Sequence, residues 1–258
     1  MARSGLEVQK VAIMALFLRE IKTRFGKYRL GYLWAALEPS AHVLIMLAIF
    51  GYIMHRTMPD ISFPVFLING IIPYFIFSNI SNRSIGAIEA NKGLFNYRPI
   101  RPIDTILARA LLETVIYVFV YILLMSVVGL LGEDFEITQL LTLVCTWILL
   151  VFLACGVGLI FMVVGKTYPE TEKFLPILIK PLYFVSCIMY PLHSVPKEYW
   201  PYLLWNPIVH AVELSRSSVF PGYQGDEVSL GYLAFCTLLV LFVGLALYRN
   251  REEAMLTS

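Results

Sequence analysis

Residues 140–165 read LLTLVCTWILLVFLACGVGLIFMVVG and contain no charged side chain. A helix needs about 20 apolar residues to cross the hydrocarbon core of a bilayer, so this segment is long enough to span it. The whole chain of 258 residues has the same character, with 59% hydrophobic and only 15% charged residues. Soluble domains carry about 25% charged residues. The composition therefore excludes a water-soluble globule and predicts an all-α integral membrane protein.

Six apolar runs predict six transmembrane helices joined by short connections. They lie at about 33–54, 65–82, 109–131, 140–165, 174–192 and 229–248, so residues 33–248 form one membrane domain. The fifth run holds Pro176 and Pro181, and proline inside a helix favours a break. Residues 193–227 hold more prolines and several charges. We expect short re-entrant helices there, at the outer face, because such backbone is tolerated where protein covers it.

The N-terminal residues 1–32 precede the first run and carry seven Lys or Arg. A cleavable signal peptide is not expected, because its apolar core would lie closer to the start. Apolar residues recur at three- and four-residue spacing, which predicts an amphipathic helix in the inner membrane interface. A solvated basic tail is the alternative. The apolar residues are Met14, Phe17, Leu18, Ile21, Phe25 and Tyr28.

The distribution of basic residues predicts the orientation of the chain. If the N-terminus is inside, the inner segments carry sixteen Lys or Arg and the outer segments carry three. Cytoplasmic loops carry such an excess, so we expect both termini, including a tail at 249–258, in the cytoplasm. The net charge of +2 is the difference of two nearly equal sums and gives no indication of nucleic-acid binding.

The sequence offers no enzyme chemistry of its own. Gly165-Lys166-Thr167 looks like the end of a phosphate-binding loop, but that loop requires Gly where Ile160 stands. The four Cys and four His are not at metal-ligand spacing, and no Ser lies in a nucleophile motif. We expect no catalytic residue, metal or cofactor on this chain, and expect nucleotide hydrolysis to come from another chain.

Charged residues at membrane depth are costly and often mark a pathway or a partner. Arg109 and Glu113 stand four residues apart. We interpret them as a helix-end pair whose side chains reach the headgroups. Lys180 lies inside the fifth run, where an ammonium group requires a water-filled cavity or a carboxylate. Aromatic residues make up 14% of the chain and form an ordinary interfacial belt or line a path for sugar rings.

The longest inner connection, residues 83–108, contains NKGLFNYRPIRP at 91–102. We expect a short helix and then a proline-stiffened turn that displays aromatic side chains beside Lys92 and Arg98. Such a segment suits docking into a groove of a partner protein. A plain linker is the alternative, although it would not need exposed aromatics.

Three motifs carry a family resemblance. The first is REIKTRF at 19–25, followed by LGYLW at 30–34 and by Pro39, and the second is GIIPYF at 70–75. The third comprises Pro191, Val195, Pro196, Trp200, Asn206, Pro207, Glu213 and Arg216. Together they resemble the motifs of the permease subunits of ABC-2 exporters, also termed type V exporters. Within this class the sequence looks most like the inner-membrane permeases that export capsular polysaccharide of the polysialic-acid type in Gram-negative bacteria.

The resemblance implies a homodimer of permeases joined to two cytoplasmic ATPase subunits that bind ATP and Mg²⁺. It implies a lipid-linked acidic polysaccharide as substrate, passed on to periplasmic and outer-membrane capsule export proteins. It also implies residue roles. The ATPase-coupling residues are Asn91, Lys92, Leu94, Phe95, Tyr97 and Arg98; the substrate-path residues are Tyr28, Trp34, Phe75, Phe77, Arg83, Lys180 and Tyr183; the periplasmic-exit residues are Trp200, Trp205, Glu213 and Arg216.

Two alternatives stay open from the sequence. A permease of the same class for O-antigen, teichoic acid, a drug or a lipid would share all three motifs. A secondary transporter would work without an ATPase, and its inner connection would have no partner. The chain shows no internal repeat, which disfavours a secondary transporter.

Overall fold

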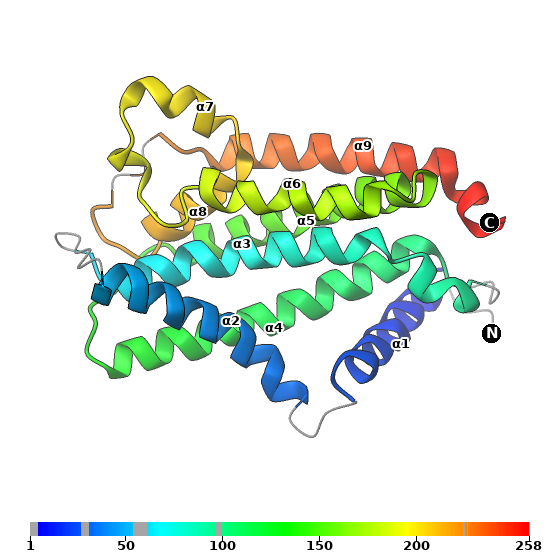
Figure 1. Cartoon of the computed structure of the whole chain (residues 1–258), viewed down its shortest axis with the longest axis horizontal. Coiled ribbons are helices and arrows are strands. Elements are labelled where there is room, and N and C mark those ends of the chain that lie inside the picture. The colour runs from blue at the N-terminus through cyan, green and yellow to red at the C-terminus, as the bar shows by residue number, and fades with distance from the viewer. Residues whose placement is uncertain are drawn as a thin grey trace.

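The computed structural model of the chain is a bundle of helices (Figure 1). It describes residues 5–26, 31–53, 61–95, 100–223, 225 and 227–257. The helices in chain order are α1 (Gly5–Phe25), α2 (Gly31–Met46), the π-helix η1 (Leu47–Ile53), α3 (Phe63–Ile85), the 3-10 helix η2 (Glu89–Leu94), α4 (Pro102–Leu130), α5 (Leu140–Thr167), α6 (Thr171–Val185), the 3-10 turns η3 (Leu192–Ser194) and η4 (Lys197–Tyr199), α7 (Trp200–Leu204), α8 (Pro207–Ser217) and α9 (Leu230–Thr257).

Five helical segments among the described residues are long and apolar enough to cross a membrane, which makes the chain a multi-pass membrane protein. They fall on five of the six predicted runs, the exception being the fifth. α4 begins at Pro102 instead of the predicted Arg109. Proline suits the first turn of a helix, and the Asp104 carboxylate accepts the Arg101 N–H at 2.9 Å.

α6 is the helix that departs from the predicted spans. It has 15 residues and is therefore about 22 Å long, at 1.5 Å per residue. The predicted break at Pro176 and Pro181 is wrong, because the helix continues through both, and the Tyr74 hydroxyl donates to the Ile179 carbonyl there. The predicted course to residue 192 is also wrong. Cys187 has a φ of 56°, in the left-handed region, which a helix cannot continue through.

α3 lies at the centre of the bundle. Most of its side chains are buried, and it contacts α2, α4, α5, α6 and α8. Behind it, α5 and α9 approach closely, since a Cβ atom on Gly244 would lie 2.7 Å from the Gly156 carbonyl oxygen. Small residues allow membrane helices to pack this way. α2 and α9, by contrast, are mostly exposed along their apolar lengths.

The two ends of the bundle differ. α1 begins and α9 ends at one end, which we call the inner end (Figure 1). The opposite, outer end carries α7, α8 and the connection between α4 and α5. α8 is almost wholly buried among α3, α5 and α9. Residues 192–217 thus form short helices as expected, and their re-entrant position in a membrane stays a prediction.

α1 attaches to the bundle through polar side chains and through the buried Ala12, Leu16 and Phe25, so Phe25 does not belong to an exposed apolar face as predicted. Gln9 Nε2, for example, donates to Asp104 Oδ1 of α4 at 3.2 Å. The apolar side chains of Val11, Met14 and Leu18 are exposed instead. They stand at three- and four-residue spacing, so they form one face that is free to lie against lipid. The interfacial position predicted for this helix is compatible with that face and stays a prediction.

Candidate substrate path and coupling surface

An aromatic cluster joins α2, α3 and α6. The ring centroid of His42 lies 4.9 Å from that of Phe75 and 5.8 Å from that of Tyr183. The His42 Nε2 atom and the Tyr183 hydroxyl are 3.0 Å apart, a hydrogen bond that ties α2 to α6. Tyr74 lies edge-on to Tyr183 at 5.2 Å and 6.5 Å from Phe77. Three residues predicted for the substrate path therefore meet in one cluster.

A stripe on α3 connects this cluster to the inner end. Phe75, Asn79 and Arg83 stand four residues apart, so they share one face of the helix. None of the three is fully buried. Asn79 Nδ2 donates to the Tyr117 hydroxyl at 2.8 Å and to the Phe75 carbonyl at 3.1 Å, which fixes its amide. The stripe offers an aromatic ring, an amide and a guanidinium in succession.

α2 and α6 contribute further aromatic and charged residues to the surface that begins with the stripe on α3. Trp34, Glu38 and His42 also recur every four residues on α2, and the first two are exposed. Lys180 is exposed on α6 and has no ion-pair partner in the part of the chain that is described. Tyr28, also predicted for the path, lies outside the described residues. We call the combined surface the path face; its members are Trp34, Glu38, His42, Phe75, Asn79, Arg83, Lys180 and Tyr183.

A charged junction lies at the inner end of the path face. Glu113 of α4 is 1% exposed, and its Oε1 atom accepts Arg24 Nη1 at 2.5 Å and Arg83 Nε at 2.9 Å. Arg109 pairs with Glu20 of α1 at 2.8 Å. The interpretation of Arg109 and Glu113 as a pair that reaches the headgroups is therefore wrong. α1 packs across α4 and supplies each of them with a separate partner.

Within this junction Arg83 is held in place and yet accessible. Its side chain is 40% exposed, while the other oxygen of Glu113, Oε2, is buried without a hydrogen-bond partner among the described residues. A buried carboxylate requires close positive charges, which explains why two arginines gather on one oxygen. A guanidinium offers several donors in one plane, so Arg83 can hold Glu113 and bind a further carboxylate.

The predicted coupling segment forms the short helix η2, in which Asn91 is the buried residue. Asn91 is 2% exposed; its amide donates to the Ala87 carbonyl at 2.7 Å and accepts a hydrogen bond from Arg19 of α1. Leu94 and Phe95 are half-buried, so Lys92 is the exposed member of the predicted set that is described. Tyr97 and Arg98 lie outside the described residues.

η2 is also attached to α5. Lys166 Nζ lies 2.5 Å from Glu89 Oε1, and this ion pair lowers the pKa of the Glu89 carboxyl below its usual value. Together with the bond between Arg19 and Asn91, it connects η2 to α1 and α5 at once. A force applied to η2 from the inner end would therefore reach two helices besides α3.

At the outer end, the predicted exit residues divide into exposed and buried ones. Trp205 is 73% exposed, whereas Trp200 is buried and donates from its indole nitrogen to the Val195 carbonyl at 2.8 Å. Arg216 is fully buried and pairs with Glu213 at 2.7 Å. In this structure the charged pair lies inside the bundle and holds α8.

The residues packed around Arg216 explain how its guanidinium is accommodated inside the bundle. Its Nη atoms donate to the carbonyls of Cys187 and Ile188 at 2.8 and 2.7 Å, and its guanidinium lies 3.5 Å from the ring centroid of Phe66. The left-handed turn at Cys187 presents these carbonyls. Gly70 makes room, because a Cβ atom there would lie 2.7 Å from Arg216 Nη2 and 2.9 Å from the Ile188 oxygen.

The amino-acid sequence matches a known family of membrane transporters. The chain belongs to the ABC-2 type transporter family, whose pattern covers residues 11–220. The family resemblance predicted from the three motifs is thereby confirmed.

Particular relatives point to capsule export. The chain is 76% identical to the polysialic acid transport protein KpsM of Escherichia coli over 258 residues, the full length of both chains. It is 30% identical to the capsule polysaccharide export inner-membrane protein BexB of Haemophilus influenzae over 257 residues, 98% of this chain and 96% of that one. The O-antigen export system permease protein RfbA of Myxococcus xanthus is 22% identical over 249 residues, 95% of this chain and 94% of the relative.

Several residues of the path face and its junction were not assigned roles from the sequence. His42 and Asn79 join the path face, while Arg24 joins Glu113 and Arg83 in the junction. The four-residue spacing of Asn79 between Phe75 and Arg83 was a usable signal. The role of Arg24 had no such signal, because its partner lies 89 positions away on another helix.

Proposed function

We propose that this chain is the membrane-spanning subunit of an ATP-driven exporter that moves an acidic capsular polysaccharide of the polysialic-acid type across the bacterial inner membrane. The observation that carries the proposal is the 76% identity to KpsM over the full length of both chains. The path face agrees with this substrate. Arg83 and Lys180 can attract the carboxylates of the polymer, and the rings of Phe75 and Tyr183 can stack on apolar sugar faces.

In this proposal two copies of the chain enclose the polymer between their path faces. α2 and α6 are mostly exposed, which leaves the path face open to a second copy. Two ATPase subunits bind ATP and Mg²⁺ and press on η2 and the residues after it. The polymer carries a lipid anchor and is handed to periplasmic and outer-membrane export proteins.

The orientation belongs to the same proposal. Both termini lie in the cytoplasm, so the inner end of the bundle is cytoplasmic and the outer end periplasmic. The excess of basic residues in the inner segments supports it. In a variant without native cysteines, a single Cys at Ser194 should react with an impermeant thiol reagent from the periplasm. A single Cys at Lys92 should react only after the membrane is opened; the reverse pattern would contradict this orientation.

Genetic replacement tests the function. We expect the chain to restore surface polysialic acid, detected with a glycan-specific antibody, in Escherichia coli cells that lack KpsM. In cells that lack an O-antigen permease it should restore nothing. Restoration of O-antigen instead, or of neither polymer by an abundant and membrane-inserted chain, would overturn the assignment to capsule export.

Coupling is tested separately. We expect Tyr97→Ala with Arg98→Glu to reduce co-purification of the ATPase and capsule export, because aromatic anchors in small interfaces contribute about 2 kcal/mol or more each. The matched control is Tyr202→Ala on α7, where an exposed aromatic lies at the opposite end. Unchanged co-purification and export would make the segment a linker.

A further inference from the structure

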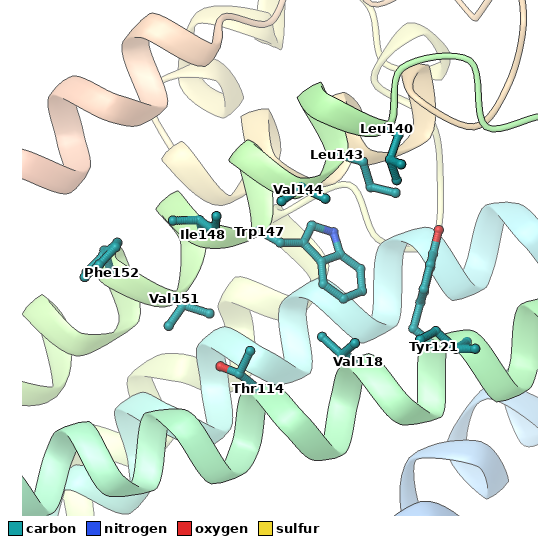
Figure 2. A pocket seen from close by; sticks show the side chains of 11 residues that line it. Thr114, Val118, Tyr121, Leu140, Leu143, Val144, Trp147, Ile148, Val151 and Phe152 are labelled. Carbon is teal, nitrogen blue, oxygen red and sulfur yellow. The ribbon is translucent and has the colours of Figure 1, made fainter. Parts of the chain in front are cut away.

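A groove with a volume of about 650 Å³ lies between α4 and α5 (Figure 2). This volume is in the range of sites for small ligands, about 300–1,000 Å³. Figure 2 shows Trp147 projecting from α5 toward Val118 and Tyr121 of α4. Both helices are membrane-spanning segments. Lining residues such as Ile122 and Ile148 are more than 40% exposed, so the groove opens toward the surrounding membrane.

The groove presents hydrocarbon because its few polar groups are bonded elsewhere. The Thr114 hydroxyl donates to the Ala110 carbonyl of its own helix at 2.7 Å. The Tyr121 hydroxyl donates to Asn69 Oδ1 at 3.0 Å, and the Trp147 indole nitrogen donates to Ser215 Oγ at 3.2 Å. No donor is left over for a polar ligand, and a buried polar group without a partner is costly. A ligand of this groove is therefore an apolar chain.

The outer mouth of the groove carries negative charge. Leu140 lines the groove and directly follows the connection between α4 and α5. Glu133, Asp134 and Glu136 on that connection are exposed. The hairpin from 110 to 165 contains no Lys or Arg to offset them. A headgroup at this mouth lies beside a connection with three exposed carboxylates, and their charge favours an ammonium group and disfavours a purely anionic headgroup.

We propose that this groove is a binding site for a phospholipid of the phosphatidylethanolamine type. One acyl chain lies between α4 and α5, and the ammonium group of the headgroup lies near Glu133, Asp134 and Glu136. The inference rests on the chain spanning a membrane and is independent of the polymer that the transporter carries.

The bound lipid has a structural consequence at the outer end. The rings of Tyr121 and Trp147 lie 4.8 Å apart and form the floor of the groove. From this floor Tyr121 is bonded to α3, and Trp147 is bonded to Ser215, the neighbour of Arg216 on α8. A ligand that binds only the folded state stabilises that state. A lipid in the groove therefore stabilises the packing of α8 against α5.

Quenching of Trp147 fluorescence by brominated lipid tests the proposal. The protein is reconstituted as a variant that keeps Trp147 alone, with Trp34, Trp200 and Trp205 changed to Phe. Bilayers contain either phosphatidylethanolamine or phosphatidylglycerol with brominated acyl chains, diluted into phosphatidylcholine. We expect brominated phosphatidylethanolamine to quench half of the fluorescence at about a threefold lower fraction of the bilayer than brominated phosphatidylglycerol. This difference corresponds to a weak exposed ion pair. If the single-Trp variant does not fold, the difference in fluorescence quenching between the natural chain and Trp147→Phe gives the quenching of Trp147.

Two variants identify the parts of the site. Val118→Phe fills the groove and should reduce quenching of Trp147 by either lipid, whereas Leu239→Phe on the exposed face of α9 should not. The triple change Glu133→Gln, Asp134→Asn and Glu136→Gln should abolish the preference between headgroups and leave the acyl-chain quenching. Equal or stronger quenching by phosphatidylglycerol in the natural chain would overturn the proposal. Protection of Trp147 from every brominated lipid would also overturn it, because a protein surface would then cover the groove.

Discussion

At the outer end Glu213 and Arg216 pair within one helix, while at the inner end Glu113 pairs with arginines from two other helices. Arg216 is fully buried and its Nη atoms are bonded to Glu213 and two backbone carbonyls. Arg83 is 40% exposed and makes one bond from its side chain to Glu113. Arg216 Nε is buried without a hydrogen-bond partner among the described residues, so no part of this guanidinium is open to a ligand. The inner pair leaves donors of Arg83 available, so in the proposed function the same two residue types serve folding at the outer end and bind substrate at the inner end.

Removal of the outer guanidinium is expected to have the largest effect. Arg216→Gln leaves Glu213 buried without its partner, and breaking a buried pair typically costs about 3–5 kcal/mol. We expect little folded protein, measured as monodisperse material in detergent and as membrane abundance. Normal abundance together with a normal melting temperature would show that the outer pair is dispensable.

A substitution at Gly70 tests the space around Arg216. In Gly70→Ala the new Cβ atom meets Arg216 and a backbone carbonyl at less than 3 Å, and such overpacking costs about 1–3 kcal/mol. We expect a lower melting temperature in detergent and reduced abundance. Gly86→Ala at the end of the same helix meets nothing within 4 Å and is the matched control. Equal melting temperatures for the two variants would contradict the account of Arg216.

The inner junction should respond differently. Arg83→Gln removes the more exposed of the two arginines that pair with the buried Glu113, and Arg24 still pairs with that carboxylate, so we expect a smaller loss of folded protein than for Arg216→Gln. Surface polysaccharide should fall several-fold, because the path face loses its charge at the inner end. The ratio of exported polysaccharide to folded permease should therefore fall when Arg83 at the inner end is changed. If both quantities fall in parallel, as expected for Arg216→Gln, Arg83 serves folding as well.

Substitutions of Lys180 are expected to have the smallest effect on stability and a graded effect on export. It is exposed and unpaired among the described residues, so its substitution should leave stability unchanged. Lys180→Arg should keep most of the export, Lys180→Gln should lose part, and Lys180→Glu should lose most through repulsion of an acidic polymer. Normal surface polysaccharide with Lys180→Glu would remove this residue from the path.

The parts of the fold that follow from the sequence are those with a local physical cause. The run from 140 to 165 has no charge and forms α5 almost to the residue. Asn and Pro are residue types that favour a helix start, and Asn206 accepts the Ile208 N–H at 3.0 Å as the cap of α8. Phe75, Phe77 and Tyr183 lie in one cluster, and each is on a helix that an apolar run in the sequence predicts.

The parts that could not be predicted depend on contacts between distant segments. The end of α6 is set by a left-handed turn at Cys187, whose carbonyl meets Arg216, 29 residues later. Arg109 pairs with Glu20 of α1, and Glu113 pairs with Arg24 of α1 and Arg83 of α3, and the spacing within α4 contains no information about either helix. The inward direction of Asn91 likewise depends on Arg19.

Photo-cross-linking at Asn79 tests most directly whether the path face carries the polymer. A photoreactive residue at this position lies between Phe75 and Arg83 on the stripe. In exporting cells, irradiation is expected to attach polysialic acid to the permease, seen with a glycan-specific antibody. The same residue at Phe242, on the exposed side of α9, is expected to give none. Continued export with no cross-link at position 79, or equal cross-linking at both positions, would contradict the account.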